Sequence, residues 1–331
     1  MAEHPHGDPL LSQLATEAIN PATSEIDRMA PIDIVRLMNE EDASVAGAVK
    51  QQLPEIAQAV EGIAGQLRNG GRLVYVGAGT SGRIGALDAY ECPPTFNVSP
   101  DMIIGCIAGA STSTTPATDA LRDTTGTVAP RDTIDTIDYE DSAEAGANDV
   151  AKLAVGRNDV LVGIAASGRT PYVLGAMRYA REQGALTIGI ACNRGTPLDQ
   201  AADIMIAPVV GPEVIAGSTR LKAGTAQKMV LNMLSTGAMI LLGKTYGNMM
   251  VDMRASNEKL RERAIRIVQM ATGLQREQAA SALEACDSET KTAILVERSH
   301  LTPAQARECL AAHGNRLRAA LEAAGPEAGS K

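Results

Sequence analysis

Two hydrophobic patterns alternate along this chain, and each predicts a different kind of element. In residues 43–67, apolar residues recur every three or four positions, which is the spacing of an amphipathic helix. Pro54 lies inside this segment and predicts a kink or a break into two helices. The glycines of Asn69-Gly70-Gly71 then suit a helix C-terminus, where glycine adopts the left-handed conformation without strain.

After this segment, short apolar runs alternate with helical stretches. The runs with strand character are residues 73–76, 102–107, 160–165, 186–191 and 204–209. Most are separated by helical material, so the pattern predicts an α/β fold with a doubly wound parallel sheet that helices cover on both faces. A longer apolar stretch, residues 229–242, is interrupted by polar residues and is too short to span a bilayer, so we expect a buried helix there.

The strand pattern stops near residue 256. Four or five short amphipathic helices are expected beyond this point, and Thr302 is a candidate N-cap for one of them. The clearest of these helices are residues 276–286, 290–298 and 303–313. A packing or oligomerisation role without chemistry is the simplest interpretation of this tail.

We therefore expect three parts: N-terminal helices in residues 1–42, an α/β domain in 43–255 and a small helical domain in 256–331. Of the 331 residues, 45% are hydrophobic, which is enough for a sizeable core, yet there is no Trp and only one Phe. Such a core must be mainly aliphatic, as suits helix-covered parallel strands. The net charge of −9, with no basic block, argues against nucleic acid or an anionic membrane as a partner.

Cysteine and histidine usage limits the chemistry. The five cysteines are widely spaced, odd in number and form no Cys-x-x-Cys pair, which favours reduced thiols over disulfides or zinc. Two of the four histidines, His4 and His6, lie near the N-terminus, so a histidine-rich metal site is not expected. The N-terminus also lacks the basic and apolar regions of an export signal. We therefore expect a cytoplasmic protein that uses no metal or other cofactor.

The first candidate site is a glycine-rich turn. The apolar run 73–76 is followed by Gly77-Ala78-Gly79-Thr80-Ser81-Gly82-Arg83 and then by a helical stretch from Ile84. A strand, a glycine turn and a helix start direct backbone N–H groups and the positive end of the helix dipole at an anion. The spacing also matches a dinucleotide-binding loop, but no acidic residue follows at the ribose-binding distance. Hydroxyls at Thr80 and Ser81 instead favour a terminal phosphate, and a tight turn without a ligand is the remaining alternative.

A second turn of the same kind follows the run 160–165. Here Ser167-Gly168-Arg169-Thr170 precedes a helical stretch from Tyr172. Because the carboxyl ends of neighbouring parallel strands lie at one edge of a sheet, both turns could grip one sugar phosphate. The candidate phosphate-binding residues are Gly79, Thr80, Ser81, Ser167, Gly168, Arg169 and Thr170. These paired turns resemble those of sugar isomerase (SIS) domains, which bind phosphosugars.

Further motifs resemble one family of SIS proteins, the N-acetylmuramic acid 6-phosphate etherases. The clearest is residues 87–96, with Glu91-Cys92-Pro93-Pro94 at its centre. Other matching segments are residues 16–20, 32–42, 211–214, 217–228, 232–237 and 247–252. Together they cover nearly the whole chain. The mammalian glucokinase regulatory protein is a distant relative, so this fold can also sense phosphosugars without transforming them.

The resemblance implies a SIS domain followed by a small, ubiquitin-associated-like helical tail, in a homodimer without metal or redox cofactor. It also implies a substrate that carries D-lactate in an ether at sugar C3 and a phosphate at C6. Ring opening would make the C2 proton acidic, a carboxylate base would remove it, and an acid would protonate the departing lactate oxygen. Water would then add at C3 and give N-acetylglucosamine 6-phosphate and D-lactate.

The family motif identifies Glu91 as the acid of this reaction. Few charges surround it in the sequence, so an apolar setting is expected to raise its pKa and keep it protonated. A glutamate that caps a helix end beside a Pro-Pro turn is the structural alternative. The resemblance also suggests that the pocket is lined by Glu213, Ser218, Arg220 and Lys222. An ordinary surface salt bridge is an equal alternative for Lys222.

The second carboxyl is where this chain departs from the family. An acidic motif is expected shortly after Gly109, but residues 111–116 are Ser, Thr and Pro only. Counting forward from Gly109 assigns the base to Asp119, whereas counting back from Glu140 reaches a residue that cannot titrate. Asp119 is therefore the candidate base, with Asp138 and Glu140 as substitutes. Because this carboxyl is displaced, a non-catalytic phosphosugar sensor is the main alternative function, and an aldose–ketose phosphosugar isomerase is a second.

Overall fold

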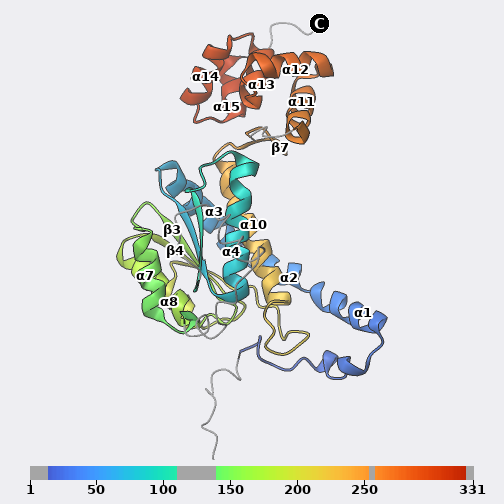
Figure 1. Cartoon of the computed structure of the whole chain (residues 1–331), viewed down its shortest axis with the longest axis vertical. Coiled ribbons are helices and arrows are strands. Elements are labelled where there is room, and N and C mark those ends of the chain that lie inside the picture. The colour runs from blue at the N-terminus through green and yellow to red at the C-terminus, as the bar shows by residue number, and fades with distance from the viewer. Residues whose placement is uncertain (1–13, 110–138, 253–257, 326–331) are drawn as a thin grey trace, which may run out of the picture. The chain divides into compact units, whose positions relative to one another are not determined.

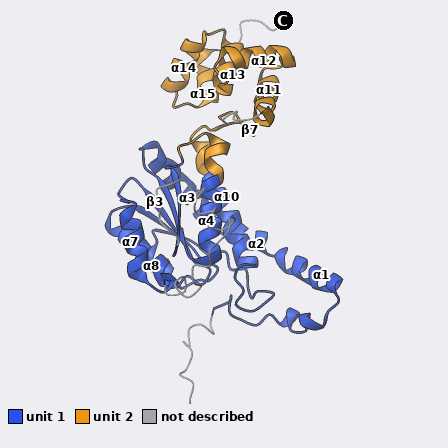
Figure 2. Cartoon of the chain, viewed as in Figure 1, with its two compact units in different colours: residues 1–90, 100–235 blue, residues 91–99, 236–331 orange. Residues whose placement is uncertain are grey.

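The computed structural model describes residues 14–109, 139–252 and 258–325. The chain divides into two compact units, shown in blue and orange in Figure 2. The larger unit contains Met1–Tyr90 and Pro100–Ser235, and the smaller contains Glu91–Ser99 and Thr236–Lys331. The division at residues 42 and 255 that we expect from the sequence stays a prediction.

The larger unit is built on a parallel sheet of five strands. Their order is β2-β1-β3-β4-β5, and every neighbouring pair is parallel. The strands are β1 (Leu73–Gly77), β2 (Ile103–Ile107), β3 (Val160–Ile164), β4 (Leu186–Ile190) and β5 (Ile204–Ile206). All five predicted strands are therefore confirmed. Every residue of β1 and β3 is buried, which explains why these strands are continuous apolar runs and do not alternate with polar residues.

Helices cover both faces of the sheet (Figure 1). On one side lie α7 (Ala143–Lys152), α8 (Pro171–Glu182) and α9 (Pro197–Ala201), and on the other lie α3 (Leu53–Arg68), α4 (Gly79–Phe96) and α10 (Lys222–Leu241). Glycines in the strands and helices allow the closest approaches between helix and sheet. A Cβ on Gly163 would lie 2.7 Å from the sulfur of Met177 in α8, and one on Gly85 would lie 3.0 Å from Cβ of Tyr75 in β1. The predicted doubly wound arrangement is thus confirmed.

The helical segment before β1 is broken where the sequence predicts it. It forms α2 (Val45–Lys50) and α3, and Pro54 occupies the first turn of α3, where its missing N–H leaves no bond unmade. At the other end of α3, Gly70 has a φ of 79°. The N–H of Gly71 donates to the Gln66 carbonyl and that of Gly70 to the Leu67 carbonyl, which is the Schellman pattern.

The N-terminal arm consists of two 3₁₀ turns, η2 (Pro21–Thr23) and η3 (Ile26–Arg28), followed by α1 (Pro31–Asp42). Near its start, the Thr23 hydroxyl donates to the Val214 carbonyl at 2.9 Å. No residue of α1 is buried, and Ile32 and Val35 expose 61% and 57% of their surface. This helix therefore presents an apolar face without cover from the described part of its own chain.

The smaller unit is mainly helical. It contains a two-residue-per-strand hairpin, β6 (Thr245–Tyr246) with β7 (Met249–Met250), then α11 (Glu258–Thr272) and α12 (Arg276–Ala285). The last helices are α13 (Thr290–Ser299), α14 (Pro303–Ala312) and α15 (Leu317–Ala324). Thr302 caps α14 as predicted, because its hydroxyl accepts the N–H of Gln305. Buried aliphatic side chains from all five helices form one core.

Among the described residues, no helix combines the length and the apolar character that crossing a membrane would require. All five cysteines are free, and four of them are buried.

Candidate active site

The two glycine turns lie at the point where the strand order of the sheet reverses. β1 is flanked by β2 on one side and by β3 on the other, and Gly77 at the end of β1 pairs with Ile164 at the end of β3. The chain leaves both strands at the same edge of the sheet. This is the position at which open parallel sheets bind ligands, so the structure brings the two predicted turns together.

The first turn is shorter than the sequence predicts. α4 begins at Gly79, not at Ile84, so Thr80 and Ser81 lie in the first turn of the helix. Gly79 has a φ of 51°, which allows the sharp change of direction after β1. Because the first helical N–H groups lack intrahelical acceptors, Gly79, Thr80 and Ser81 present their amides at the site as well as two hydroxyls.

A glutamine that sequence reasoning missed contacts this turn. The Ser81 hydroxyl donates to Oε1 of Gln227, in the second turn of α10, at 3.0 Å. Gln227 is only 1% exposed. Its amide nitrogen Nε2 has no hydrogen-bond partner among the described residues. Leaving a buried donor unpaired costs about 1–3 kcal/mol, so this nitrogen marks a group that a ligand or a rearrangement can satisfy.

The second turn holds its hydroxyl in a different way. The Ser167 oxygen accepts the backbone N–H of Arg169 at 3.2 Å, a local turn within the loop. Gly168 has a φ of 69°, and a Cβ there would overlap the side chain of Thr196, which follows β4. Thr196 is the N-cap of α9, and the carboxylate of Asp199 accepts both its N–H and its hydroxyl. This turn is therefore braced by the next turn along the sheet edge.

Glu91 lies on α4, three turns after Ser81. Neither the apolar setting expected for it nor the alternative of a helix cap is found in the described residues of the single chain. Its side chain is exposed in the single chain, so the described residues do not provide an apolar setting. The helix also continues through Pro93 and Pro94 to Phe96, so there is no Pro-Pro turn for Glu91 to cap. The prolines lack N–H groups, and the carbonyls of the preceding turn are left without helical partners.

A buried aspartate, which sequence reasoning also missed, fixes α4 in the larger unit. Asp88 Oδ2 accepts the hydroxyl of Tyr75 from β1 at 2.9 Å. Its Oδ1 accepts the amide of Asn232 at 2.7 Å and the hydroxyl of Ser235 at 3.1 Å, both from α10. These bonds join strand and helices one turn before Glu91. The helical spacing alone could not reveal them, because the donors lie far away in the sequence.

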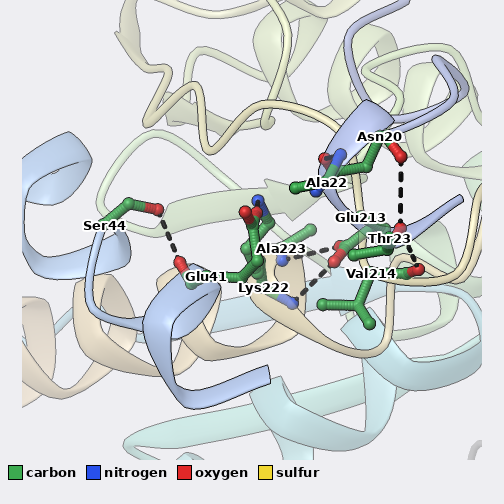
Figure 3. A network of polar contacts seen from close by, with 9 residues as sticks. All are labelled: Asn20, Ala22, Thr23, Glu41, Ser44, Glu213, Val214, Lys222 and Ala223. Atoms are coloured by element: carbon green, nitrogen blue, oxygen red, sulfur yellow. Dashed lines mark hydrogen bonds and ion pairs between the residues drawn. The ribbon is translucent and has the colours of Figure 1, made fainter. Parts of the chain in front are cut away.

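Glu213 and Lys222 belong to a third cluster, drawn in Figure 3. The Glu213 carboxylate is fully buried and accepts the N–H groups of Lys222 and Ala223 at 2.9 and 3.0 Å, so it caps the start of α10. The ammonium of Lys222, also buried, pairs with the Glu41 carboxylate of α1 at 2.6 Å. In the unliganded chain Lys222 thus contacts Glu213 through its backbone and Glu41 through its side chain. Contact of Glu213 and Lys222 with a substrate stays a prediction.

The remaining candidate site residues include Asp119, Asp138, Glu140 and Ser218. Asp119 and Asp138 lie outside the described residues. Glu140 is half-buried, and burial, with a smaller contribution from the neighbouring Asp141 carboxylate, raises its pKa. Ser218 is half-buried in the segment that leads into α10. No group of three or more His, Cys, Asp and Glu side chains among the described residues is placed to hold a metal ion.

The smaller unit has a polar cavity of its own, of about 550 Å³. Its charged lining residues pair with one another: Lys244 and Lys291 with Asp252, and Arg307 with Asp287 and Glu289. The charges of this cavity are therefore balanced without a ligand.

Comparison with known proteins defines the class first. A SIS domain model matches residues 139–237, and a model of the C-terminal lid domain of glucokinase regulatory protein matches residues 247–293. Among solved structures, a phosphoheptose isomerase from Francisella tularensis has a TM-score of 0.44 and 18% identity, covering 64% of this chain and 100% of that one. A similarity this low adds nothing to the assignment. The domain matches, with the sheet and its paired turns, make this a SIS-domain protein with a helical C-terminal lid.

The family follows from closer relatives. The N-acetylmuramic acid 6-phosphate etherase of Rubrobacter xylanophilus is 52% identical over 314 residues, which are 95% of this chain and 98% of that protein. The protein of the same name from Streptomyces coelicolor is 50% identical and covers 98% of this chain and 99% of its own. This chain belongs to the N-acetylmuramic acid 6-phosphate etherase family.

Proposed function

We propose that this chain cleaves the D-lactyl ether of N-acetylmuramic acid 6-phosphate, giving N-acetylglucosamine 6-phosphate and D-lactate. The observation that carries the proposal is the meeting of two hydroxyl-bearing turns at the switch point of the sheet, which suits a phosphate monoester. Family membership at about half identity over nearly the full length supports the lactyl ether as the bond that is broken. The role that fits is recycling of cell-wall amino sugars.

The proposed reaction proceeds by elimination and then hydration. With the ring open, the C1 aldehyde makes the C2 proton acidic, and a carboxylate removes it. The electron pair forms a C2–C3 double bond as the C3–O bond breaks, and an acid gives its proton to the lactate oxygen. Water then adds its hydroxyl to C3 and a proton to C2. Each acid or base contributes about 10²- to 10⁴-fold to the rate.

Glu91 is the proposed acid, and a homodimer is the proposed source of its apolar setting. On α4, Leu87, Tyr90 and Glu91 share one helix face, because they are separated by three and four positions. Leu87 and Tyr90 are each 42% exposed, so this face carries apolar surface that the described residues do not cover. A second copy packed on this face would bury both side chains and place apolar surface beside Glu91. Sedimentation that finds only a 34.5 kDa species at micromolar concentration would refute the dimer.

The proposed base is Asp119, and Glu140 and Asp138 are the substitutes. Asp119 is the acidic residue that counting forward from Gly109 reaches. Glu140 is supported by its raised pKa, since a carboxylate with a higher pKa is a stronger base. Ser218, Glu213 and Lys222 are proposed to border the sugar, and a cytoplasmic location is proposed because the chain keeps five free thiols.

The decisive experiment measures two steps separately. Purified protein is incubated with N-acetylmuramic acid 6-phosphate in deuterated solvent, and D-lactate release and C2 deuterium exchange are both followed. Glu91→Gln should abolish lactate release but still exchange C2, because the amide keeps the shape of the side chain and cannot supply a proton. Asp119→Asn should lose both, because C2 deprotonation comes first.

Two outcomes would redirect the proposal. Full activity in Asp119→Asn would remove Asp119 as the base and leave Glu140 and Asp138 to be tested in the same way. Wild-type protein that binds N-acetylglucosamine 6-phosphate but neither exchanges C2 nor releases lactate would contradict the etherase proposal and favour a phosphosugar sensor.

A further inference from the structure

In the Ser81–Gln227 contact the serine hydroxyl is the donor, which does not suit phosphate binding. The single hydrogen of the Ser81 hydroxyl is directed at Gln227 Oε1, so it is not available to an anion. The two hydrogens of Gln227 Nε2 meanwhile have no acceptor among the described residues, although the side chain is almost completely buried. The pair thus leaves two buried N–H hydrogens without an acceptor, while the Ser81 hydroxyl does not offer its hydrogen to the site.

A half-turn of the carboxamide would free the Ser81 hydrogen and give one of the Nε2 hydrogens an acceptor. Rotation about the last side-chain bond exchanges Oε1 and Nε2 in nearly the same space, because the two ends of a carboxamide have similar size. Nε2 would then donate to the Ser81 oxygen, and the Ser81 hydrogen would be free to point at the ligand. A chain of donors in this order also polarises the hydroxyl and strengthens its bond to an anion.

We infer that Gln227 is a positioning residue that sets the direction of the Ser81 hydroxyl. In the unliganded chain Ser81 donates to Gln227. When the phosphate group docks, the carboxamide turns over, donates to Ser81, and Ser81 donates to a phosphate oxygen. The inference rests on the proposed function, since it needs phosphate at the first turn. Ser167 requires no such partner, because its oxygen already accepts a backbone N–H within its own turn.

The test compares two substitutions by calorimetric titration with N-acetylglucosamine 6-phosphate between pH 5 and 8. In Gln227→Glu, the new carboxylate can only accept, so it holds the Ser81 hydrogen and adds a negative charge beside the phosphate. We expect affinity about 100-fold below wild type at pH 8, because the charge-assisted hydrogen bond from Ser81 to the phosphate is lost and a like-charge repulsion is added. The ratio to wild type should recover as the pH falls, because a protonated carboxyl can donate to Ser81. A merely structural defect would not give this pH dependence.

Gln227→Met removes donor and acceptor but keeps the length of the side chain. We expect affinity to fall about tenfold, as for one lost hydrogen bond, with a ratio to wild type that does not change with pH. If Gln227 acts through Ser81, the same substitution in a Ser81→Ala background should lower affinity no further. This second variant keeps the test valid if Gln227→Glu folds poorly.

Gln52→Glu is the matched control. Gln52 is also a buried glutamine of the larger unit, and its Oε1 accepts the N–H of Ala207 at 2.9 Å. It should lower the melting temperature without changing phosphosugar affinity. Gln227→Glu that binds within twofold of wild type at pH 8, or that is equally weak at every pH, would overturn the inference. Wild-type protein that fails to bind the phosphosugar would overturn the proposed function and the inference with it.

Discussion

The two turns at the switch point have similar sequences and different physical supports. Both place a serine within two residues of a left-handed glycine after a buried strand. In the first turn, the Ser81 hydroxyl depends on Gln227, 146 residues further along the chain, and nothing lies within 4 Å of a Cβ added to Gly79. In the second, Ser167 bonds to a backbone N–H two residues away, while Gly168 lies directly against Thr196.

The two turns therefore differ in what sets the direction of the serine hydroxyl and in what fixes the backbone. The hydroxyl of the first turn is set by tertiary structure, and its backbone is open to a ligand. The hydroxyl of the second turn is set locally, and its backbone is fixed by a neighbouring turn. A phosphate held between them would therefore meet one adjustable donor and one that is already in place.

The largest expected effect comes from adding one methyl group to each glycine. Gly168→Ala combines the left-handed φ of 69° with overlap on Thr196, and should lower the free energy of unfolding by about 3 kcal/mol. Gly79→Ala meets no neighbour and should cost about 1 kcal/mol for its φ of 51° alone. Urea unfolding of both variants measures the difference. Equal losses would mean that Thr196 does not brace the second turn.

A smaller effect is expected from removing each hydroxyl. Ser81→Ala leaves both ends of the buried Gln227 carboxamide unpaired and should cost about 1–2 kcal/mol of unfolding free energy. Ser167→Ala leaves only the N–H of a half-buried loop without its acceptor, and should cost about 0.5 kcal/mol.

Both variants should also bind N-acetylglucosamine 6-phosphate about tenfold more weakly, because each removes one donor to the proposed phosphate. Unfolding curves and calorimetry on the same samples separate stability from affinity. Unchanged affinity in both variants would contradict the proposal that the two turns share one phosphate. If the two variants lost affinity unequally and stability equally, the contrast drawn between the two turns would be wrong.

Local sequence was sufficient for most of the fold. The five strands are apolar runs, so the strands themselves and the complete burial of β1 and β3 could be predicted. The break before α3 and the Thr302 cap follow from preferences that act within four residues. The passage of α4 through Pro93 and Pro94 could not be predicted, because prolines normally end a helix.

The sequence by itself determined the strands, the two serine-bearing turns and the capping residues, because backbone preferences and short loops decide these. Tertiary structure alone decided that Gln227 meets Ser81, that Asp88 ties α4 to β1 and α10, and that Glu41 meets Lys222. It also left Glu91 exposed where sequence reasoning expected an apolar setting. The physical reason is range: a side chain's partners, its burial and hence its pKa depend on residues that only packing brings within a few ångströms.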